Sequence, residues 1–293
     1  MSVFVCGSLH LDIMVSAPHL PRVDETVTGQ AVAYAFGGKG GNQAVAAARM
    51  GARVAMAGRV GSDRFGDSLL TGLAEAGVDA TQVLRDQGAS GMSVAIVQPG
   101  GDYGAVIVSA ANLTIEPDRV SLPADARILL LQNEVPEATN QSLAAKARAK
   151  GCMVVLNAAP ARPMPPALLA LVDLLVLNRI EAEDLLSAPM DPLKAVAALS
   201  RLGPRLVCLT LGADGLVLWD GVATRLPADP VTAISSHGAG DAFIGALAAR
   251  LDAADALLDA VQFAQAAAAL HVATPVPDRA LITPAAVRAF QNR

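Results

Sequence analysis

The sequence predicts an α/β fold in which helices cover both faces of a mostly parallel sheet. Short, nearly continuous apolar runs alternate along the 293 residues with helical patterns, and 53% of all residues are apolar. Strands that are buried on both faces have such runs, and their alternation with helices is typical of three packed layers. No linker or internal repeat interrupts the pattern, so we expect a single domain over residues 1–293.

The strands and helices of this core can be placed in order. The apolar runs predict strands over residues 3–7, 53–58, 127–132, 153–157, 174–178 and 206–212. Helical patterns occupy residues 42–50, 64–76, 137–149, 241–251 and 255–273. Gly51 follows the first of these helices as a glycine at its C-terminal cap would.

Two stretches depart from this alternation. Residues 12–36 carry no helix signal, and residues 91–108 are typical of a hairpin that turns at residues 99–102. We predict that these two stretches, 12–36 and 91–108, meet in a small β lid. In an open α/β fold, ligands bind beyond the carboxyl ends of the strands, which is where such a lid is expected.

Composition excludes several classes of protein. The net charge is −5 and aromatic residues make up only 3%, which argues against a nucleic-acid-binding surface. Cys6, Cys152 and Cys208 each lie in an apolar run and indicate buried thiols, not a disulfide or metal framework. Neither a signal peptide nor a membrane-spanning run is recognised, so we expect a cytoplasmic protein without a membrane partner.

The segment SSHGAGDAFIGA, residues 235–246, is the first candidate site. Gly238, Ala239 and Gly240 precede an apparent helix start, where free N–H groups and the helix dipole favour an anion. Asp241 in the first turn is placed to take a proton from a hydroxyl that attacks a bound phosphate. The alternative is a glycine-rich turn with Asp241 as a helix cap. The sequence contains no Walker A motif.

The segment FGGKGGNQAVAAARMG, residues 36–51, is the second candidate. Its glycines allow the backbone to approach a ligand closely, and Asn42 offers both a donor and an acceptor, as a sugar hydroxyl requires. Lys39 adds a mobile positive charge. The alternative is a flexible turn with a solvated lysine.

Together the two segments resemble the signatures of the ribokinase/PfkB family of sugar kinases. The resemblance extends over nearly the whole chain through the segments GSLHLD (7–12), DETVTG (24–29), GGKGGNQA (37–44), NAAPAR (157–162), NRIEAE (178–183) and TLGADG (210–215). It implies the three-layer ribokinase-like fold and an ATP-dependent kinase acting on the primary hydroxyl of ribose or a closely related sugar.

The resemblance also implies roles on the phosphate side. Asp241 would be the catalytic base, and the amides of Gly238, Ala239 and Gly240 would form an anion hole. Asn178 and Glu181 match an N-x-x-E motif that organises Mg²⁺, expected here to act through water. The nucleotide-binding positions that match are Asn178, Thr210, Gly212 and Gly215, with Gln265 near the adenine or simply packed there.

On the sugar side, the resemblance implies hydroxyl contacts from Asp12, Gly38, Asn42 and Glu134. Lys39 is expected to help neutralise the transferring phosphate. His10 stands where the family has an asparagine, which suggests either an altered sugar preference or a histidine satisfied by backbone groups.

One family feature is altered. Members usually carry an Asp-Thr pair before the second signature that helps to hold an activating monovalent cation, and Ser235 and Ser236 replace it here. The later cation loop corresponds to residues 271–284, which contain neither glycine nor serine. Activation by K⁺ is therefore in doubt, and our hypothesis is that Arg279 or His237 occupies the space with a positive charge.

Three other readings stay open at this point. A nucleoside kinase would need aromatic residues to stack on a base, and the only N-terminal candidates are Phe4, Tyr34 and Phe36. A kinase for another pentose or ketose keeps the same chemistry. A non-catalytic sugar-binding relative would have no need for Asp241 beside a phosphate site. The resemblance further implies a homodimer that pairs through the lid.

Overall fold

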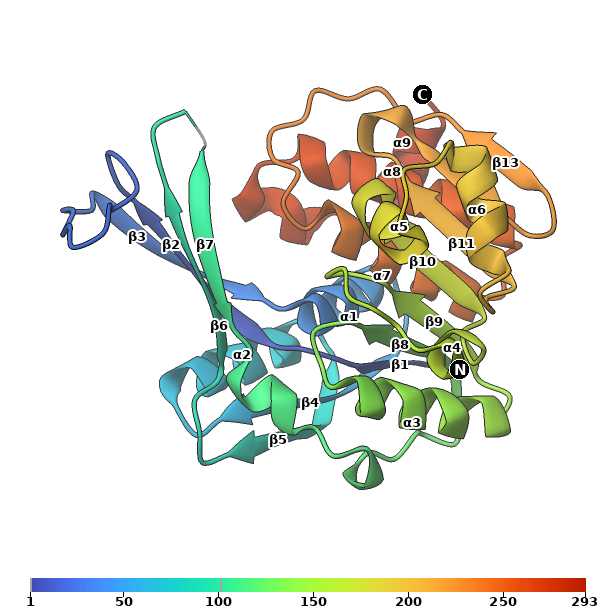
Figure 1. The fold of residues 1–293 in the computed structure, drawn as a ribbon, viewed down its shortest axis with the longest axis horizontal. Coiled ribbons are helices and arrows are strands. Elements are labelled where there is room, and N and C mark those ends of the chain that lie inside the picture. Colours follow the sequence, from blue (N-terminus) through green and yellow to red (C-terminus); the bar gives the residue numbers. More distant parts are fainter. Residues whose placement is uncertain (1, 101) are drawn as a thin grey trace.

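The computed structural model describes residues 2–100 and 102–293, and a long, mostly parallel sheet forms its centre (Figure 1). Within these residues the sheet has nine strands in the order β13-β12-β11-β10-β9-β8-β1-β4-β5. Their bounds are β1 Ser2–Cys6, β4 Val54–Gly61, β5 Asp79–Asp86, β8 Ala126–Gln132, β9 Met153–Asn157, β10 Leu174–Asn178, β11 Leu206–Thr210, β12 Leu216–Trp219 and β13 Ala223–Leu226. Among the described strands of this sheet, the pairs β11–β12 and β12–β13 are antiparallel and the other pairs are parallel.

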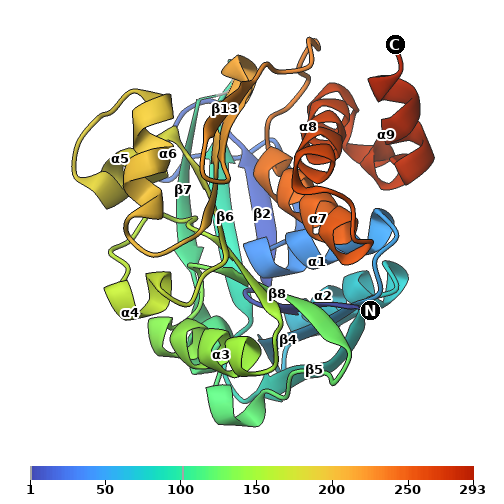
Figure 2. The ribbon, with the colours of Figure 1, turned by 90° about the vertical axis from the view of Figure 1, so that its right-hand side faces the viewer.

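Helices cover both faces of the sheet, as Figure 2 shows. One face carries α1 Lys39–Arg49, α2 Arg64–Glu75, α7 Ala239–Asp252, α8 Leu257–Ala273 and α9 Pro284–Gln291. The other carries α3 Glu137–Ala149, α4 Pro166–Leu169, α5 Arg179–Leu186 and α6 Pro192–Ser200. Side chains alternate along each strand, so in β1 Val3 and Val5 enter the first core while Phe4 and Cys6 enter the second.

A second, four-stranded sheet projects from this body (Figure 1). It consists of β2 His10–Ser16, β3 Ala31–Gly37, β6 Gly91–Val97 and β7 Tyr103–Val108, in the order β3-β2-β6-β7. β2 pairs antiparallel with β3 and parallel with β6 over seven residues each. The two stretches that break the α/β pattern in the sequence therefore meet in one small sheet, as predicted. The predicted turn at 99–102 includes Gly101, which lies outside the described residues.

The predicted core strands and helices are all present, with ends that shift by a few residues. The largest shifts, three residues each, are at the end of β4, which reaches Gly61 and not residue 58, and at α1, which begins at Lys39 and not at residue 42. Gly40 and Gly41 are thus helical, and sequence reasoning missed this because glycine disfavours helices. Packing decides instead: a Cβ on Gly40 would lie 2.6 Å from the Gly7 carbonyl carbon, and one on Gly41 2.7 Å from Leu9 Cδ2.

The three cysteines are free, buried thiols, as the sequence predicts. Cys6, Cys152 and Cys208 are buried and free, and burial raises the pKa of Cys6 and of Cys208 to about 12. Among the described residues, no helix combines the length and the apolar character that a membrane crossing needs.

Helices α1 and α7 pack unusually close at Gly245, and this contact yields a stability prediction. A Cβ at Gly245 would lie 2.4 Å from Ala46 Cβ and 2.8 Å from the Gln43 carbonyl oxygen. We expect Gly245→Ala to lower the free energy of unfolding by about 1–3 kcal/mol through overpacking. Helix propensity alone predicts the opposite sign, a gain of about 1 kcal/mol.

Denaturant unfolding measures the difference. Ala74→Gly, on the exposed side of α2, is the control for propensity without packing. A Gly245→Ala variant that is more stable than the parent protein would contradict the close approach of the two helices.

Candidate active site

The candidate site lies where several parallel strands end at the same edge of the main sheet. There a cavity of about 330 Å³ opens between the strand ends and the start of α7. It is lined by Lys39, Asn157, Ala159, Val176, Leu177, Asn178, Glu181, Thr210, Gly212, Ser236, Gly238, Ala239, Gly240, Asp241, Phe243 and Ile244. Residues from both candidate segments, and from the N-x-x-E motif, therefore share one cavity.

Asp241 lies in the first turn of α7 and connects this helix to α1. Its Oδ2 accepts a hydrogen bond from Asn42 Nδ2 at 3.2 Å, and its Oδ1 accepts one from Gln43 Nε2 at 2.9 Å. Burial raises the pKa of Asp241, while the charge of Lys39 and the two amide donors act in the opposite direction. The carboxylate is therefore oriented by two donors and held in an environment that favours proton uptake.

Backbone N–H groups at the start of α7 lie beside the cavity and could together face an anion. Gly238 is the N-cap of α7 in the left-handed region, with φ +76°, and lines the cavity. Within the described chain, the N–H groups of Gly238, Gly240 and Asp241 meet no backbone acceptor. Ala239 differs from the sequence prediction, because its N–H donates to the Ser236 carbonyl oxygen at 3.1 Å. The tight turn before α7 brings these two groups together. The N–H groups that remain available to a ligand are therefore those of Gly238, Gly240 and Asp241, and not that of Ala239.

Glu134, which is not in the cavity lining, fixes the start of α1. Its Oε2 accepts hydrogen bonds from the Ser8 hydroxyl and from the Lys39 backbone N–H. Gly38, at φ +87°, lets the chain pass the β1–β2 connection, since a Cβ there would lie 2.7 Å from the His10 N atom. The glycine-rich segment is thereby held between Glu134 and Asp241.

His10 and Asp12 lie at the start of β2, beside Glu134. His10 is only 2% exposed; its Nδ1 is 3.9 Å from Glu134 Oε2, and its buried Nε2 has no hydrogen-bond partner among the described residues. Burial lowers the pKa of His10 and raises that of Asp12. Asp12 Oδ2 lies 3.9 Å from His237 Nε2, so the small sheet and the loop before α7 face each other here.

Asn178 and Glu181 form the start of α5. Asn178 caps the helix by accepting from the Glu181 N–H at 3.0 Å, and Glu181 accepts from the Asn178 backbone N–H at 2.8 Å. Burial raises the pKa of Glu181. No cluster of three or more His, Cys, Asp or Glu side chains suited to a metal occurs in residues 2–100 and 102–293. A cation at Glu181 would thus have to take most of its ligands from phosphate and water.

The four other nucleotide positions separate into two groups. Thr210 and Gly212 line the cavity at the end of β11. Gly215 lies outside the cavity lining; it closes the β11–β12 turn, where a Cβ would lie 2.1 Å from the Leu226 carbonyl oxygen. Gln265, on α8, is not in the lining either, and its Nε2 donates to the Pro227 carbonyl oxygen.

Sequence reasoning missed two side chains of the site. Gln43 is fully buried and donates to Asp241, and Ser8 donates to Glu134. Both lie within segments that carried the family resemblance, but neither residue type has chemistry that stands out in a sequence. Their role is visible only once the helix and the strand end are placed.

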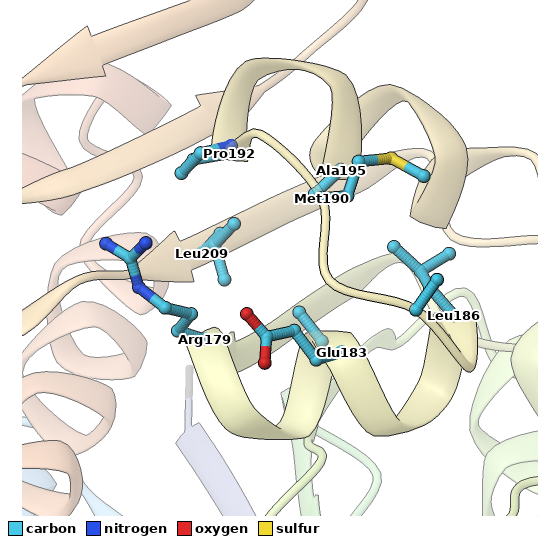
Figure 3. A pocket seen from close by; sticks show the side chains of 9 residues that line it. Arg179, Glu183, Leu186, Met190, Pro192, Ala195 and Leu209 are labelled. Atoms are coloured by element: carbon cyan, nitrogen blue, oxygen red, sulfur yellow. The ribbon is translucent and has the colours of Figure 1, made fainter.

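A much smaller cavity lies between α5 and α6 (Figure 3). It is lined by Arg179, Glu183 and several apolar side chains and measures about 10 Å³. That volume is about enough for one water molecule, so it is no substrate site.

A three-layer α/β fold that places backbone N–H groups at a helix start and the Asp241 carboxylate beside one cavity is the arrangement expected of a phosphotransferase. Comparison with known proteins agrees. Residues 2–281 match the model of the pfkB family carbohydrate kinases, and the chain belongs to this family.

Several individual proteins are similar to this chain over most of its length. The ribokinase of Haemophilus influenzae is 36% identical over 279 residues, covering 92% of this chain and 91% of the relative. The deoxyribokinase of Salmonella typhimurium is 31% identical, covering 85% of each chain. The structure of Arabidopsis thaliana ribokinase complexed with ribose and ATP superimposes with a TM-score of 0.92 at 27% identity, covering 100% of this chain and 99% of that chain. The predicted fold class and family are thereby confirmed, and the protein is a carbohydrate kinase.

The hydrogen bond from Gln43 to Asp241 leads to a pH prediction. We expect the pKa of Asp241 to lie above the ordinary value of about 3.9, so its base form is lost as the pH falls through that higher value. Gln43→Leu removes a donor that stabilises the carboxylate and therefore raises the pKa further.

Carboxyl-carbon NMR titration of Asp241, or the acidic limb of the pH–kcat profile, measures this. Gln82→Leu removes a glutamine that bonds the backbone at the surface and serves as the control. An acidic limb that moves to lower pH in Gln43→Leu would contradict the account.

Proposed function

We propose that this carbohydrate kinase transfers the γ-phosphate of ATP to the primary hydroxyl of ribose or a closely related sugar. One observation carries the proposal: the Asp241 carboxylate stands beside the unpaired N–H groups at the start of α7, at the wall of the cavity. A carboxylate beside a bound phosphate is electrostatically unfavourable. It becomes useful if it accepts the proton of the hydroxyl that attacks the phosphoryl group.

Each group then has one role in the transfer. Asp241 removes the proton of the attacking hydroxyl, while the amides at Gly238 and Gly240 stabilise charge on the phosphoryl group. Backbone donors aimed at developing charge are worth ~3 kcal/mol each. The positive charge of Lys39 acts to lower the pKa of both Asp241 and Glu181, so it is close enough to both carboxylates to offset charge on a phosphate between them. Asn42 and Gln43 hold the base in its orientation.

Mg²⁺ fits the nucleotide end of the cavity. Glu181 offers a carboxylate at the cavity wall, and both of its oxygens also accept from Asn178, which suits indirect binding through water. Mg²⁺ keeps several waters and is usually held by one or two carboxylates together with substrate phosphates. Bound there, it would neutralise phosphate charge, while Thr210 and Gly212 would lie along the nucleotide.

Carboxylates favour a polyhydroxylated acceptor on the other side. Asp12 and Glu134 accept hydrogen bonds from hydroxyl pairs, and a site with such groups rejects analogues that leave them unpaired. Relatives include both ribokinases and deoxyribokinases. The buried, unpartnered Nε2 of His10 is the group by which this chain would differ in sugar preference.

The nucleoside-kinase alternative finds little support. Phe4 is fully buried in the core, and Phe36 packs against Gly41 and Gly72, so neither is free to stack on a base. Tyr34 alone is exposed, at 62%, on the small sheet. A non-catalytic role is disfavoured because Asp241 keeps two donors that orient it.

Assembly and location are part of the proposal. The small sheet exposes large apolar side chains, including Val32 and Tyr34 on β3 and Val106 and Ile107 on β7. Pairing of two such sheets would cover them, so we propose a homodimer through the lid. Free buried thiols agree with a reducing, cytoplasmic compartment.

Sugar preference is tested by ADP release with Mg·ATP over ribose, deoxyribose, other pentoses, ketohexoses and nucleosides. We expect the highest kcat/KM with ribose. Turnover confined to a nucleoside would contradict the proposal. His10→Asn is the matched variant, and we expect it to change the ribose-to-deoxyribose ratio of kcat/KM while leaving kcat on the better sugar within about tenfold.

The role of Asp241 is tested by Asp241→Asn. We expect kcat to fall by about 10²–10⁴-fold, because a general base contributes that much, while ADP and sugar bind nearly as before in calorimetry. Asp259→Asn, an equivalent aspartate in the first turn of α8, is the control and should leave kcat unchanged. An unaltered kcat in Asp241→Asn would remove this carboxylate from the mechanism.

A further inference from the structure

Two backbone carbonyls that precede α7, those of Ser235 and His237, converge on one buried guanidinium. Arg279 Nη2 donates to the Ser235 carbonyl oxygen at 2.8 Å, and Arg279 Nη1 donates to the His237 carbonyl oxygen at 2.9 Å. Arg279 Nε donates to the Thr274 carbonyl oxygen at 3.2 Å. The residue is only 8% exposed and belongs to the 3₁₀ helix Val276–Leu281, which follows α8.

These bonds bear on the anion hole through the geometry of the peptide unit. In a planar trans peptide, the carbonyl of one residue and the N–H of the next point in opposite directions. The His237 carbonyl points at Arg279, so the Gly238 N–H points the other way, on the side where Gly238 lines the cavity. His271 Nε2 approaches the same carbonyl oxygen at 2.9 Å and reinforces the orientation.

The same place bears on the monovalent cation that the family resemblance implies. The residues here do not fit such a cation. Ser235 supplies no carboxylate, and the carbonyl oxygens of Ser235, His237 and Thr274 already accept from Arg279. A second positive charge at these oxygens would have to displace the guanidinium. His237, the alternative candidate, contributes its carbonyl here, while its imidazole faces Asp12 and is largely exposed.

We propose that the Arg279 guanidinium takes the place of a monovalent cation and is a positioning residue for the anion hole. It holds the His237–Gly238 peptide plane, and the Ser235–Ser236 plane before it, so that the Gly238 N–H faces the cavity. A guanidinium suits this task because it is always charged, and its planar fork of donors meets several carbonyls at once. The kinase then works without K⁺. This inference rests on the proposed function.

The unaltered protein provides the first test. We expect kcat and the Tm to be the same in K⁺, Na⁺ and tetramethylammonium at equal ionic strength. A rise in either quantity that is specific to K⁺ would overturn the proposal. The thermal measurement needs no substrate, so it tests the inference even if the acceptor proves to be another sugar or if no phosphorylation is found.

Arg279→Ala provides the second test. Misplacement of the anion hole should lower kcat about 100-fold with little change in the KM for the sugar, and millimolar guanidinium should restore most of the loss. Arg279→Lys keeps the positive charge but loses the planar set of donors, so its kcat should lie between those of the unaltered protein and Arg279→Ala. Arg250→Ala, at the far end of α7 and paired with Asp255, is the matched control that guanidinium should not rescue.

Two results of the variant experiment would overturn the proposal. One is an Arg279→Ala enzyme with unchanged kcat. The other is a folded Arg279→Ala enzyme whose loss of kcat does not respond to guanidinium. If the variant fails to fold, the cation measurements on the unaltered protein decide.

Discussion

The contact between α1 and α7 is the constraint on which the rest of this site depends. Two helices from opposite ends of the chain approach each other because Gly245 carries no side chain where Ala46 and Gln43 press against it. That approach brings Asn42 and Gln43 within hydrogen-bond distance of Asp241. The glycine-rich segment that begins α1 and the start of α7 are thereby joined at the Asp241 carboxylate, whose orientation is set by side chains on helices.

Electrostatics then explains why this carboxylate can serve as a base. It sits at the positive end of a helix, near Lys39, yet burial raises its pKa. The nearby charge of Lys39 and the amide donors of Asn42 and Gln43 oppose this rise, and the raised pKa favours uptake of a proton by the carboxylate. Asp12 and Glu134, both near His10, are the carboxylates that we propose bind sugar hydroxyls, and Arg279 donates to two carbonyls of the loop before α7.

The fold and the cavity were largely readable from the sequence, because buried parallel strands and glycine-rich helix starts leave strong local signals. Other elements were not predicted, because β12, β13 and α4 are short and β5, α5 and α6 are partly exposed, which weakens their hydrophobic patterns. The early start of α1 and the bond of the Ala239 N–H to Ser236 depend on packing and turn geometry. Gln43 acts through Asp241, a partner distant along the chain, which no local pattern reveals, whereas Arg279 was named from the altered cation loop and only its exact partners needed the structure.

The most direct test of this account is the identity of the phosphorylated hydroxyl. The product formed from ribose and Mg·ATP should be examined by proton-coupled ³¹P NMR. Transfer to the primary hydroxyl predicts a triplet, because the phosphate oxygen is attached to a carbon with two hydrogens. A doublet, from a phosphate on a ring carbon with one hydrogen, would contradict the placement of that hydroxyl against Asp241, and release of inorganic phosphate alone would contradict sugar phosphorylation.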